Sequence, residues 1–354
     1  MVNIHELLKK LVELEGSDLH LIPGISPIFR VNGKTRTVFD QTLNAEDCSR
    51  LCYSVMSELQ QKQFEKKKEL DFSFGIASLG RFRANIYFQR GSVSMAIRYI
   101  PYEIKNVSEL GLPKTVLDFV DKPSGLVLVT GSTGSGKSTT LAALIDRINS
   151  SHQGHILTIE DPIEFVHKHK KCIVSQREVN ADTVSFASAL RVALRQDPDF
   201  VLIGEMRDVE TIEAALTIAE TGHLTLATLH TNSAVQTINR IIDAFPESHQ
   251  AQIRTQLSFV LQGVISQVLL PCLTGGRILA TEILVSTPAV SAMIRDEKNH
   301  QIQGMIETGQ KYGMHTMDAC LVDLVAARKI EKAEALRRCS SIDSFNRLLS
   351  GKVR

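Results

Sequence analysis

The hydrophobic pattern of the N-terminal part of the chain predicts a small α+β domain. Apolar residues recur with helical spacing over 2–14, and a strand begins at Asp18–Leu21. After a Pro-Gly turn, a second strand at Ile28–Val31 ends in Asn32-Gly33, a dipeptide that favours a two-residue hairpin turn. A helical pattern then extends from about residue 45 to residue 68.

A second hairpin is predicted after this helix. Its first strand, 81–88, has apolar even-numbered residues on one face and Arg81 and Arg83 on the other, because side chains alternate along a strand. The chain turns back into a strand over 93–100, which carries Arg98. The hairpin therefore has an arginine-bearing face, either a functional surface or an ordinary solvated basic one.

From residue 126 onward, short apolar runs alternate with helical segments, a pattern typical of a mostly parallel sheet in an α/β fold. Beyond about Pro246 the pattern becomes largely helical. We predict an N-terminal domain over 1–100, a proline-containing linker over 101–113 and a second domain over 114–354. The strands predicted in the second domain are 126–130, 155–159, Phe200–Ile203, Leu224–Leu229 and Arg277–Val285.

Composition narrows the function classes. Lys and Arg number 40 against 39 Asp and Glu, so the net charge is +1, without the basic excess typical of nucleic-acid-binding proteins. The six cysteines form no C-x-x-C pair, which favours reduced thiols in a cytoplasmic protein over a disulfide framework or zinc ribbon. We find no signal-peptide pattern and no apolar run of about 18 residues, so any membrane role is expected to be peripheral.

The strand at 126–130 leads directly into a glycine-rich loop and then a helical pattern over 138–148. The loop fits G-x-x-x-x-G-K-[ST], and strand, loop and helix are the context in which this motif cradles nucleotide phosphates. Lys137 is expected to reach the β- and γ-phosphates, and the Ser138 hydroxyl to ligate Mg²⁺. The residues predicted to bind ATP are Gly131, Ser132, Thr133, Gly134, Ser135, Gly136, Lys137, Ser138 and Thr139.

Acidic residues follow two of the predicted strands. Glu205 comes after Phe200–Ile203 in the manner of a Walker B acid, which holds Mg²⁺ directly or through water, although Gly204 stands where Asp is usual. Glu160 and Glu164 follow the strand at 155–159. Ligands of open α/β sheets bind at the carboxyl ends of strands, so one of these acids is expected to polarise the attacking water. Ordinary turn acids are the alternative.

Two histidines bracket the strand Leu224–Leu229. Seven residues of strand span roughly 23 Å, so His223 and His230 cannot both touch one phosphate or chelate one metal. His230 lies at the carboxyl end, on the nucleotide side, and is the better candidate for a γ-phosphate sensor. His223 belongs to the far end, where a structural hydrogen bond is the alternative role.

Together these segments resemble the secretion-ATPase superfamily and, within it, the type IV pilus retraction ATPases of the PilT family. SDLHL at 17–21 and the stretch 277–282 also fit, so the resemblance covers nearly the whole chain. It implies a hexameric ring whose subunits have a PAS-like N-terminal domain and a RecA-like P-loop ATPase domain. The matching segments are GSTGSGKSTT (131–140), TIEDPIEF (158–165), ALRVALRQDPD (189–199), GEMRD (204–208) and TGHLTLATLHTN (221–232).

The resemblance also implies roles for individual residues. Glu164 matches the family's catalytic base, with Glu160 as the alternative because it lies closer to the strand. Arginines of the N-terminal domain are expected to reach nucleotide from the same or a neighbouring subunit, and Arg81, Arg83 and Arg98 fit that role. Arg191 and Arg195, four apart on one predicted helical face, are further candidates for contact with phosphate or a neighbour.

The family implies a cytoplasmic motor, peripheral at the inner face of the cell membrane, that powers pilus retraction and twitching motility. Such a ring docks on an integral membrane platform protein and acts on the pilin assembly indirectly. The chain lacks the four-cysteine motif of extension and secretion members, which favours retraction. Its segment 289–296 only partly matches the family's Ala-Ile-Arg-Asn helix, so an accessory pilus or secretion ATPase paralogue stays open. A RecA-like nucleic-acid motor is the remaining alternative, against which the balanced charge counts.

Overall fold

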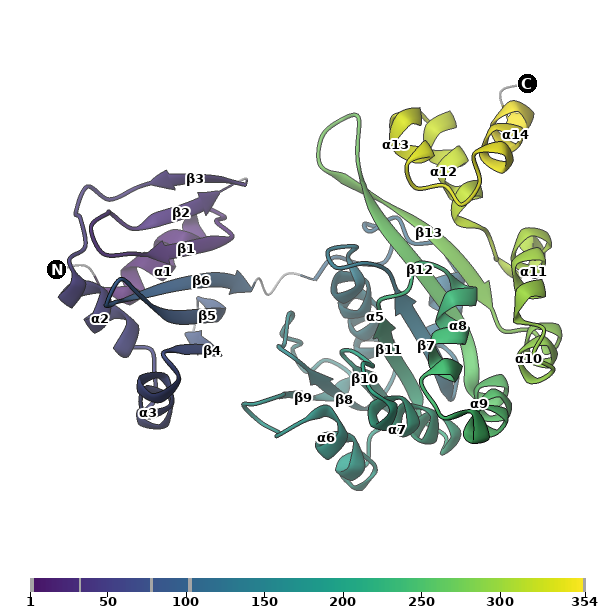
Figure 1. Cartoon of the computed structure of the whole chain (residues 1–354), viewed down its shortest axis with the longest axis horizontal. Helices are drawn as coiled ribbons and strands as arrows, with labels where there is room; N and C mark the ends of the chain where they lie inside the picture. Colours follow the sequence, from purple (N-terminus) through teal and green to yellow (C-terminus); the bar gives the residue numbers. More distant parts are fainter. Residues whose placement is uncertain (1–2, 32, 77–78, 101–103, 353–354) are drawn as a thin grey trace. The chain divides into compact units, whose positions relative to one another are not determined.

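A computed structural model describes residues 3–31, 33–76, 79–100 and 104–352 of the chain (Figure 1). The chain divides into two compact units. The first unit comprises the described residues before Ile104 together with the short segment Glu164–Val166, and the second comprises 104–163 and the described residues from His167 onward. In the part of the chain that the structure describes, no helix is both long enough and apolar enough to cross a membrane.

The first unit is an antiparallel sheet packed against helices. Within the described residues its strands run in the order β3-β2-β1-β6-β5-β4. Fully buried leucine and phenylalanine side chains from sheet and helices form its core. The elements are α1 (Ile4–Glu13), β1 (Asp18–Leu21), β2 (Ile28–Val31), β3 (Lys34–Thr37), α2 (Ala45–Tyr53), α3 (Glu58–Lys67), β4 (Glu69–Ile76), β5 (Gly80–Gln89) and β6 (Ser92–Ile100).

All four strands predicted for this unit are present, and two more join them. The predicted hairpin turn includes Asn32, which lies outside the described residues, and Val31 pairs with Lys34 as a two-residue turn requires. β3 was not predicted because all of its side chains are exposed and polar, so it has no apolar alternation. β4 was not predicted either, and it extends the sheet beside β5.

The helical stretch predicted over 45–68 is present, but it is divided into two helices, α2 and α3. The second helix starts anew at Ser57, the N-cap of α3: its hydroxyl accepts from the Gln60 backbone at 3.4 Å, and the Gln60 side chain accepts from the Ser57 backbone at 2.9 Å. Such a capping box uses backbone groups that a continuous helix would need for its own hydrogen bonds.

The second unit is built on one mixed sheet. Its described strands run in the order β13-β12-β7-β11-β10-β8-β9, and neighbours are parallel except for the antiparallel hairpin of β12 and β13. The strands are β7 (Gly125–Thr130), β8 (Gly154–Glu160), β9 (Cys172–Glu178), β10 (Phe200–Ile203), β11 (Leu224–Leu229), β12 (Leu261–Pro271) and β13 (Arg277–Val285). The fold class predicted from the sequence, an α/β P-loop domain preceded by a smaller α+β domain, is confirmed.

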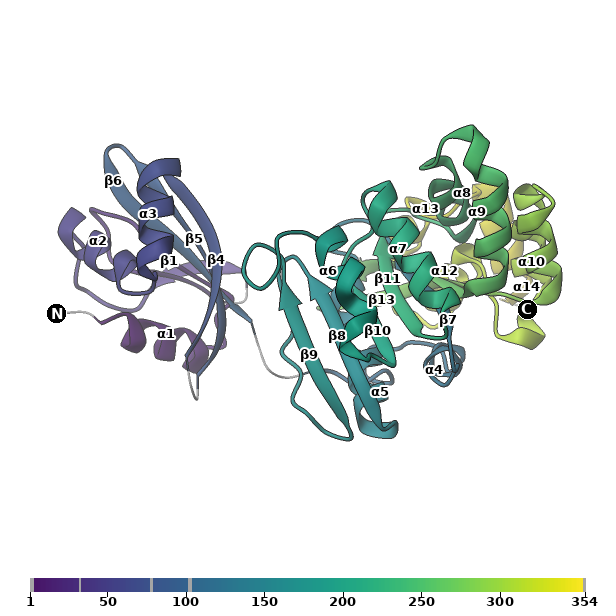
Figure 2. The same ribbon diagram turned by 90° about the horizontal axis from the view of Figure 1, so that it is seen from below.

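Helices cover both faces of this sheet (Figure 2). One core layer joins the sheet to α6–α9, and the other joins it to α4 and α5. A separate small core forms where the C-terminal helices pack on the ends of β12 and β13. The α-helices are α4 (Thr115–Val120), α5 (Lys137–Ser151), α6 (Phe186–Ala193), α7 (Val209–Glu220), α8 (Ala234–Asp243), α9 (Glu247–Val260), α10 (Pro288–Arg295), α11 (Ile302–Thr308), α12 (Met317–Ala326), α13 (Lys332–Leu336) and α14 (Ile342–Lys352).

Two strands of this sheet were not predicted. β12 falls in the region expected to be largely helical, which is a correction to the sequence analysis. It is buried on both faces along most of its length, so its residues show no alternation that would separate a strand from a buried helix. β9 is an edge strand of mixed polarity, and its pattern is equally indistinct.

Candidate functional site

The glycine-rich loop connects β7 to α5 as predicted. β7 ends at Thr130 and α5 begins at Lys137. The ammonium of Lys137 is held against the loop, since it donates to the carbonyl oxygens of Gly131 at 2.8 Å and Ser132 at 3.3 Å. Ser138, in the first helical turn, is half-buried. The loop thus presents a cation, a hydroxyl and the N-terminus of α5 on one side, which suits a polyphosphate.

The unpredicted strand β12 packs against this loop and fixes it. The side-chain amide of Gln267, 3% exposed, donates to the Ser135 carbonyl at 2.9 Å, and the hydroxyls of Ser266 and Thr130 lie 2.9 Å apart. A Cβ on Gly131, whose φ is +144°, would lie 2.4 Å from the Gln267 carbonyl oxygen. A polar Ser-Gln pair inside an apolar run is the sequence signal that could have indicated this role.

Glu205 lies just beyond β10 and joins two other side chains. One of its carboxylate oxygens, Oε1, lies 2.8 Å from Nε of Arg207 and 3.0 Å from Nε2 of His230. Partial burial raises the pKa of Glu205, but the hydrogen bond from Arg207 and the charges of Arg207, His230 and Lys137 outweigh it, so the pKa is lowered. Glu205 is therefore a carboxylate at neutral pH, as an Mg²⁺ ligand must be. Arg207 was missed, although it lies in the quoted GEMRD segment.

A side chain at Gly204, where aspartate is usual, would be crowded by the neighbouring strand. A Cβ there would lie 3.2 Å from both the Glu160 Cα and the Ile159 carbonyl oxygen. These are backbone atoms of the neighbouring strand β8, and they are held close because the Gly204 backbone donates to the Ile159 oxygen at 2.8 Å. The tight approach of the two strand ends therefore favours a residue without a side chain at this position.

The acids after β8 differ in their surroundings. Glu160 is the last residue of the strand, and its Oε1 accepts from the Thr158 hydroxyl at 2.6 Å and from the Gln176 amide at 3.2 Å. Asp161 and Glu164 are exposed in the loop beyond. Asp161 lies close enough to Arg207 to contribute, after Glu205, to raising the pKa of that guanidinium. Acidic residues that follow β8 and β10, Asp161 and Glu205, therefore lie near Arg207.

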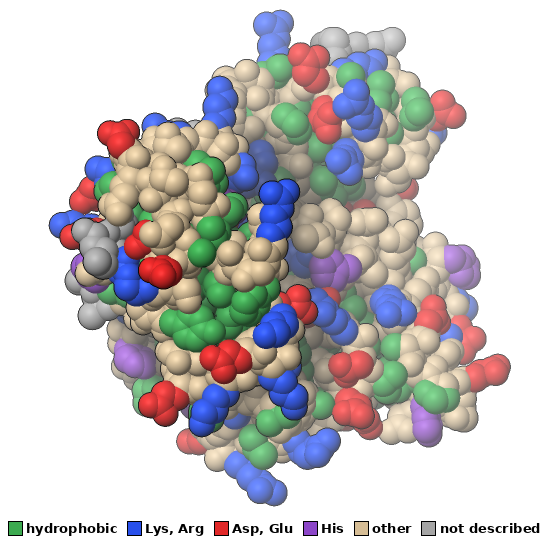
Figure 3. Space-filling model, turned by 60° about the vertical axis from the view of Figure 1, so that its left-hand side comes forward, with side chains coloured by type: hydrophobic (Ala, Val, Ile, Leu, Met, Phe, Trp, Pro, Cys, Tyr) green, Lys and Arg blue, Asp and Glu red, His purple; other side chains and the backbone are tan. Residues whose placement is uncertain are grey.

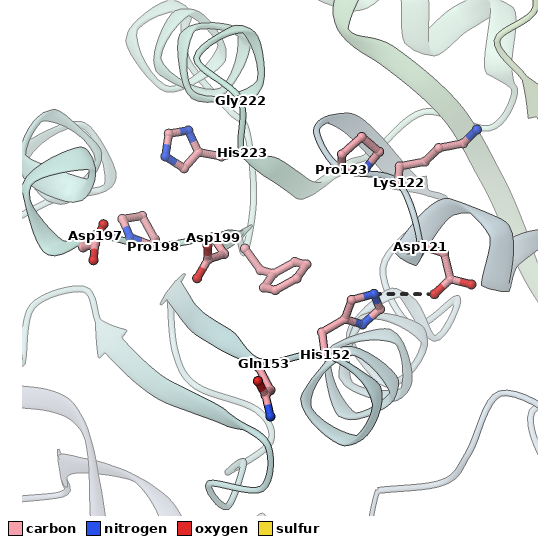
Figure 4. A pocket seen from close by; sticks show the side chains of 11 residues that line it. Asp121, Lys122, Pro123, His152, Gln153, Asp197, Pro198, Asp199, Gly222 and His223 are labelled. Atoms are coloured by element: carbon pink, nitrogen blue, oxygen red, sulfur yellow. Dashed lines mark ion pairs between the residues drawn. The ribbon is translucent and has the colours of Figure 1, made fainter.

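The structure separates the two histidines, as a continuous strand requires. His230 follows the carboxyl end of β11 and meets Glu205. His223 precedes β11, with Nδ1 3.1 Å from the Ile218 carbonyl oxygen. It lines a pocket of about 350 Å³ at the opposite edge of the sheet, together with His152 and Asp199 (Figure 4). His223 therefore has the structural hydrogen bond that was its alternative role.

The predicted arginines of the first unit lie on the hairpin of β5 and β6. Arg83 is directly opposite Arg98 in the strand register, and both are exposed. Nε of Arg98 donates to Asp18 at 2.9 Å, and Arg30, which the sequence analysis missed, lies 3.8 Å from the same carboxylate. Arg81 is half-buried. The reach of these side chains to a nucleotide stays a prediction.

Arg191 and Arg195 are both exposed, but they do not share one α-helical face as predicted. Arg191 lies on α6, which ends at Ala193, and Arg195 lies in the 3-10 turn Leu194–Gln196. The chain then passes through Asp197 in the left-handed region, with φ of +52°, so the α-helix cannot continue.

Comparison with known proteins agrees with this geometry. The model of the family described as type II/IV secretion system protein matches residues 2–308. The chain belongs to this family. It is 47% identical over 344 residues to the type IV pilus retraction ATPase PilT of Pseudomonas aeruginosa, covering 97% of this chain and 100% of that protein. It is 46% identical to a twitching motility protein of Neisseria gonorrhoeae, with 91% and 86% covered. It is 39% identical to the type IV pilus ATPase PilU of Pseudomonas aeruginosa, with 98% and 91% covered.

Solved structures support the same assignment. The fold matches a crystal structure of the pilus retraction motor PilT with bound ADP at a TM-score of 0.93 and 47% identity, covering 98% of this chain and all of that one. It matches the ATPase DotB of Legionella pneumophila at a TM-score of 0.78 and 26% identity, with 94% of both chains covered. The RecA-like ATPase domain and the placement of the chain in the PilT branch of the family are therefore shown.

Proposed function

We propose that this protein is a motor ATPase that hydrolyses ATP to power type IV pilus retraction. The observation that carries the proposal is the convergence of the phosphate loop, Glu205 and His230 at the carboxyl ends of adjacent parallel strands. Full-length similarity to PilT, including its structure with ADP, supports the same function.

The glycine-rich loop and the first turn of α5 would bind ATP. Backbone N–H groups of residues 131–136 and the helix N-terminus would face the phosphates, and Lys137 would exchange its contacts with the loop carbonyls for phosphate oxygens. Gln267 stabilises this conformation of the loop, because its side-chain amide donates a hydrogen bond to the Ser135 carbonyl oxygen.

The residues present suit Mg²⁺. The Ser138 hydroxyl and the Glu205 carboxylate, kept ionised by its lowered pKa, would hold the ion directly or through water. When bound, the ion neutralises charge on the phosphates. Both donors are oxygens, which is the ligand chemistry that Mg²⁺ prefers.

Hydrolysis needs a base that orients the attacking water. We assign this role to Glu164, which is exposed and lies beyond the end of β8, and keep Glu160 as the alternative. The Glu160 carboxylate already accepts from Thr158 and Gln176, which favours a structural role for it. His230 is placed to couple events at the γ-phosphate to Glu205, because it meets Glu205 at 3.0 Å.

The proposed assembly is a homo-hexameric ring at the cytoplasmic face of the inner membrane, docked on an integral membrane platform protein and acting on pilin through it. In such a ring, Arg81, Arg83, Arg98, Arg191 and Arg195 are candidates for contacts with nucleotide or with a neighbouring subunit. Arginine donated across an interface stabilises transition-state charge and links hydrolysis to subunit movement.

Two alternatives are weaker. An accessory pilus ATPase is suggested by the 39% identity to PilU, but the identity to PilT is higher and covers all of PilT. A nucleic-acid motor would need a continuous basic surface, whereas Lys and Arg are interspersed with Asp and Glu among the described residues on the face in Figure 3.

Lys137→Ala tests the ATPase assignment. Loss of the phosphate-binding cation should abolish turnover, to below about one hundredth of the wild-type rate, while the circular dichroism spectrum stays unchanged. The measurement is phosphate release by the full-length protein with ATP and Mg²⁺. Turnover close to wild type in the folded variant would refute the assigned site.

A further inference from the structure

Two side chains of the edge strand β9 hold the loop beyond β8 at two points. Oε2 of Glu178 accepts a hydrogen bond from the Ile163 backbone at 3.2 Å, and Oε1 of Gln176 accepts one from the His167 backbone at 2.8 Å. Glu164 lies between these two backbone groups in the chain. We propose that Gln176 and Glu178 are positioning residues for ATP hydrolysis that fix the segment carrying the base. This inference rests on the proposed function of Glu164.

Glu178 is a rigid anchor for this purpose. Its side chain is buried, with 4% of the residue exposed, and Ile163 is 3% exposed. Its backbone is tied to the following turn, because its N–H donates to the Asp182 carboxylate at 2.8 Å and its carbonyl accepts from the Asp182 backbone at 2.8 Å. A hydrogen bond that is shielded from water is costly to lose, since no solvent replaces the missing partner.

Gln176 uses both ends of its amide. While Oε1 accepts from His167, Nε2 donates to Oε1 of Glu160 at 3.2 Å. β9 runs parallel to β8 with Thr158 opposite Gln176 and Glu160 opposite Glu178, so the strand register sets the reach of both side chains. One side chain therefore joins the loop to the end of the strand from which it departs.

Loss of the contacts from Gln176 and Glu178 should affect the hydrolysis step and not nucleotide binding. A base must lie within hydrogen-bond distance of the attacking water, and a displacement of about 1 Å can cost on the order of 100-fold in rate. Nucleotide binding depends instead on the phosphate loop, which β7, α5 and β12 hold independently. Loss of the β9 contacts should thus lower kcat and leave nucleotide affinity intact.

The first test uses the full-length protein and four variants. Glu178→Ala and Gln176→Ala should lower kcat for ATP by about tenfold or more, with ADP affinity within about twofold of wild type. Glu178→Gln keeps an oxygen acceptor for the Ile163 backbone and should retain most of the rate. Ile173→Ala, on the same strand but 64% exposed, is the matched control and should behave as wild type.

The second test places Glu178→Ala in a Glu164→Gln background. Because Glu178 acts through Glu164, its loss should change the residual rate by less than about twofold there. The proposal is overturned if both alanine variants keep wild-type kcat, if ADP affinity falls as far as kcat, or if Glu178→Ala costs the same factor in both backgrounds. Wild-type turnover of Glu164→Gln alone would instead refute the base assignment.

Discussion

At several positions in this protein, the surrounding atoms determine which type of residue fits. At Gly204 the backbone of β8 would crowd any side chain, and the acid proposed to hold Mg²⁺ is the next residue. Glu205 in turn shares one oxygen between a guanidinium and an imidazole, so movement of His230 acts directly on a predicted Mg²⁺ ligand. The motif residues were predictable from the sequence. Gln176 was not, because its partners His167 and Glu160 lie on another segment of the chain, and Arg207 was missed although its partner Glu205 is only two residues away.

His167 gives a prediction at this scale. Burial, with a smaller effect of the Lys170 charge, lowers its pKa from 6.5 to about 4, against an opposing effect of Asp146. The folded protein therefore keeps His167 neutral at pH values where the unfolded chain binds a proton. Stability is fully present above about pH 6.5 and falls as the pH drops toward 4, by about 3 kcal/mol at about 1.4 kcal/mol per pKa unit.

Urea unfolding of wild type and His167→Gln between pH 7 and pH 4 measures this effect. The free energy of unfolding should fall more steeply with acid in the wild type, because only its unfolded chain gains the proton at residue 167. The account of His167 fails if both proteins lose stability in parallel over that range.

At the scale of helices and strands, the strands with a clear hydrophobic pattern were the ones predicted from the sequence. Strands β10, β11 and β13 were predicted with their observed bounds, and β7 within one residue, because each is a short apolar run between turn or helix signals. β12 and β9 were missed because a strand buried on both faces and a mixed edge strand lack alternation. These two strands supply the side chains that support the phosphate loop and the acidic loop. Gln176, Glu178 and Gln267 were therefore missed together with the strands that carry them.

Gln267→Ala tests the role of β12. Loss of its hydrogen bond to the Ser135 carbonyl should loosen the phosphate loop and weaken ADP binding by about fivefold, the equivalent of about 1 kcal/mol. Gln262→Ala is a matched control, because that side chain donates to the Ser124 carbonyl before β7 rather than to the loop. Calorimetric titration should show weaker binding for the first variant alone. Equal affinities in all three proteins would contradict the supporting role.

At the scale of the whole molecule, the chain pairs an arginine-bearing antiparallel sheet with a RecA-like ATPase unit. Neither unit alone explains a motor: the second holds the proposed nucleotide site, and the first carries the exposed arginines Arg83 and Arg98. The family relationship supplies the ring in which such parts would meet. The sequence predicted both units, but the assembly and its membrane partner rest on the proposed function.

The most direct test of the central claim is retraction itself. In a strain from which the gene has been deleted, extended pili should stop retracting under fluorescence microscopy, and the wild-type protein supplied in trans should restore retraction. The Lys137→Ala protein, present at the same level, should not. Normal pilus retraction in the deletion strain, or restoration by the Lys137→Ala protein, would contradict the proposal that this ATPase is the retraction motor.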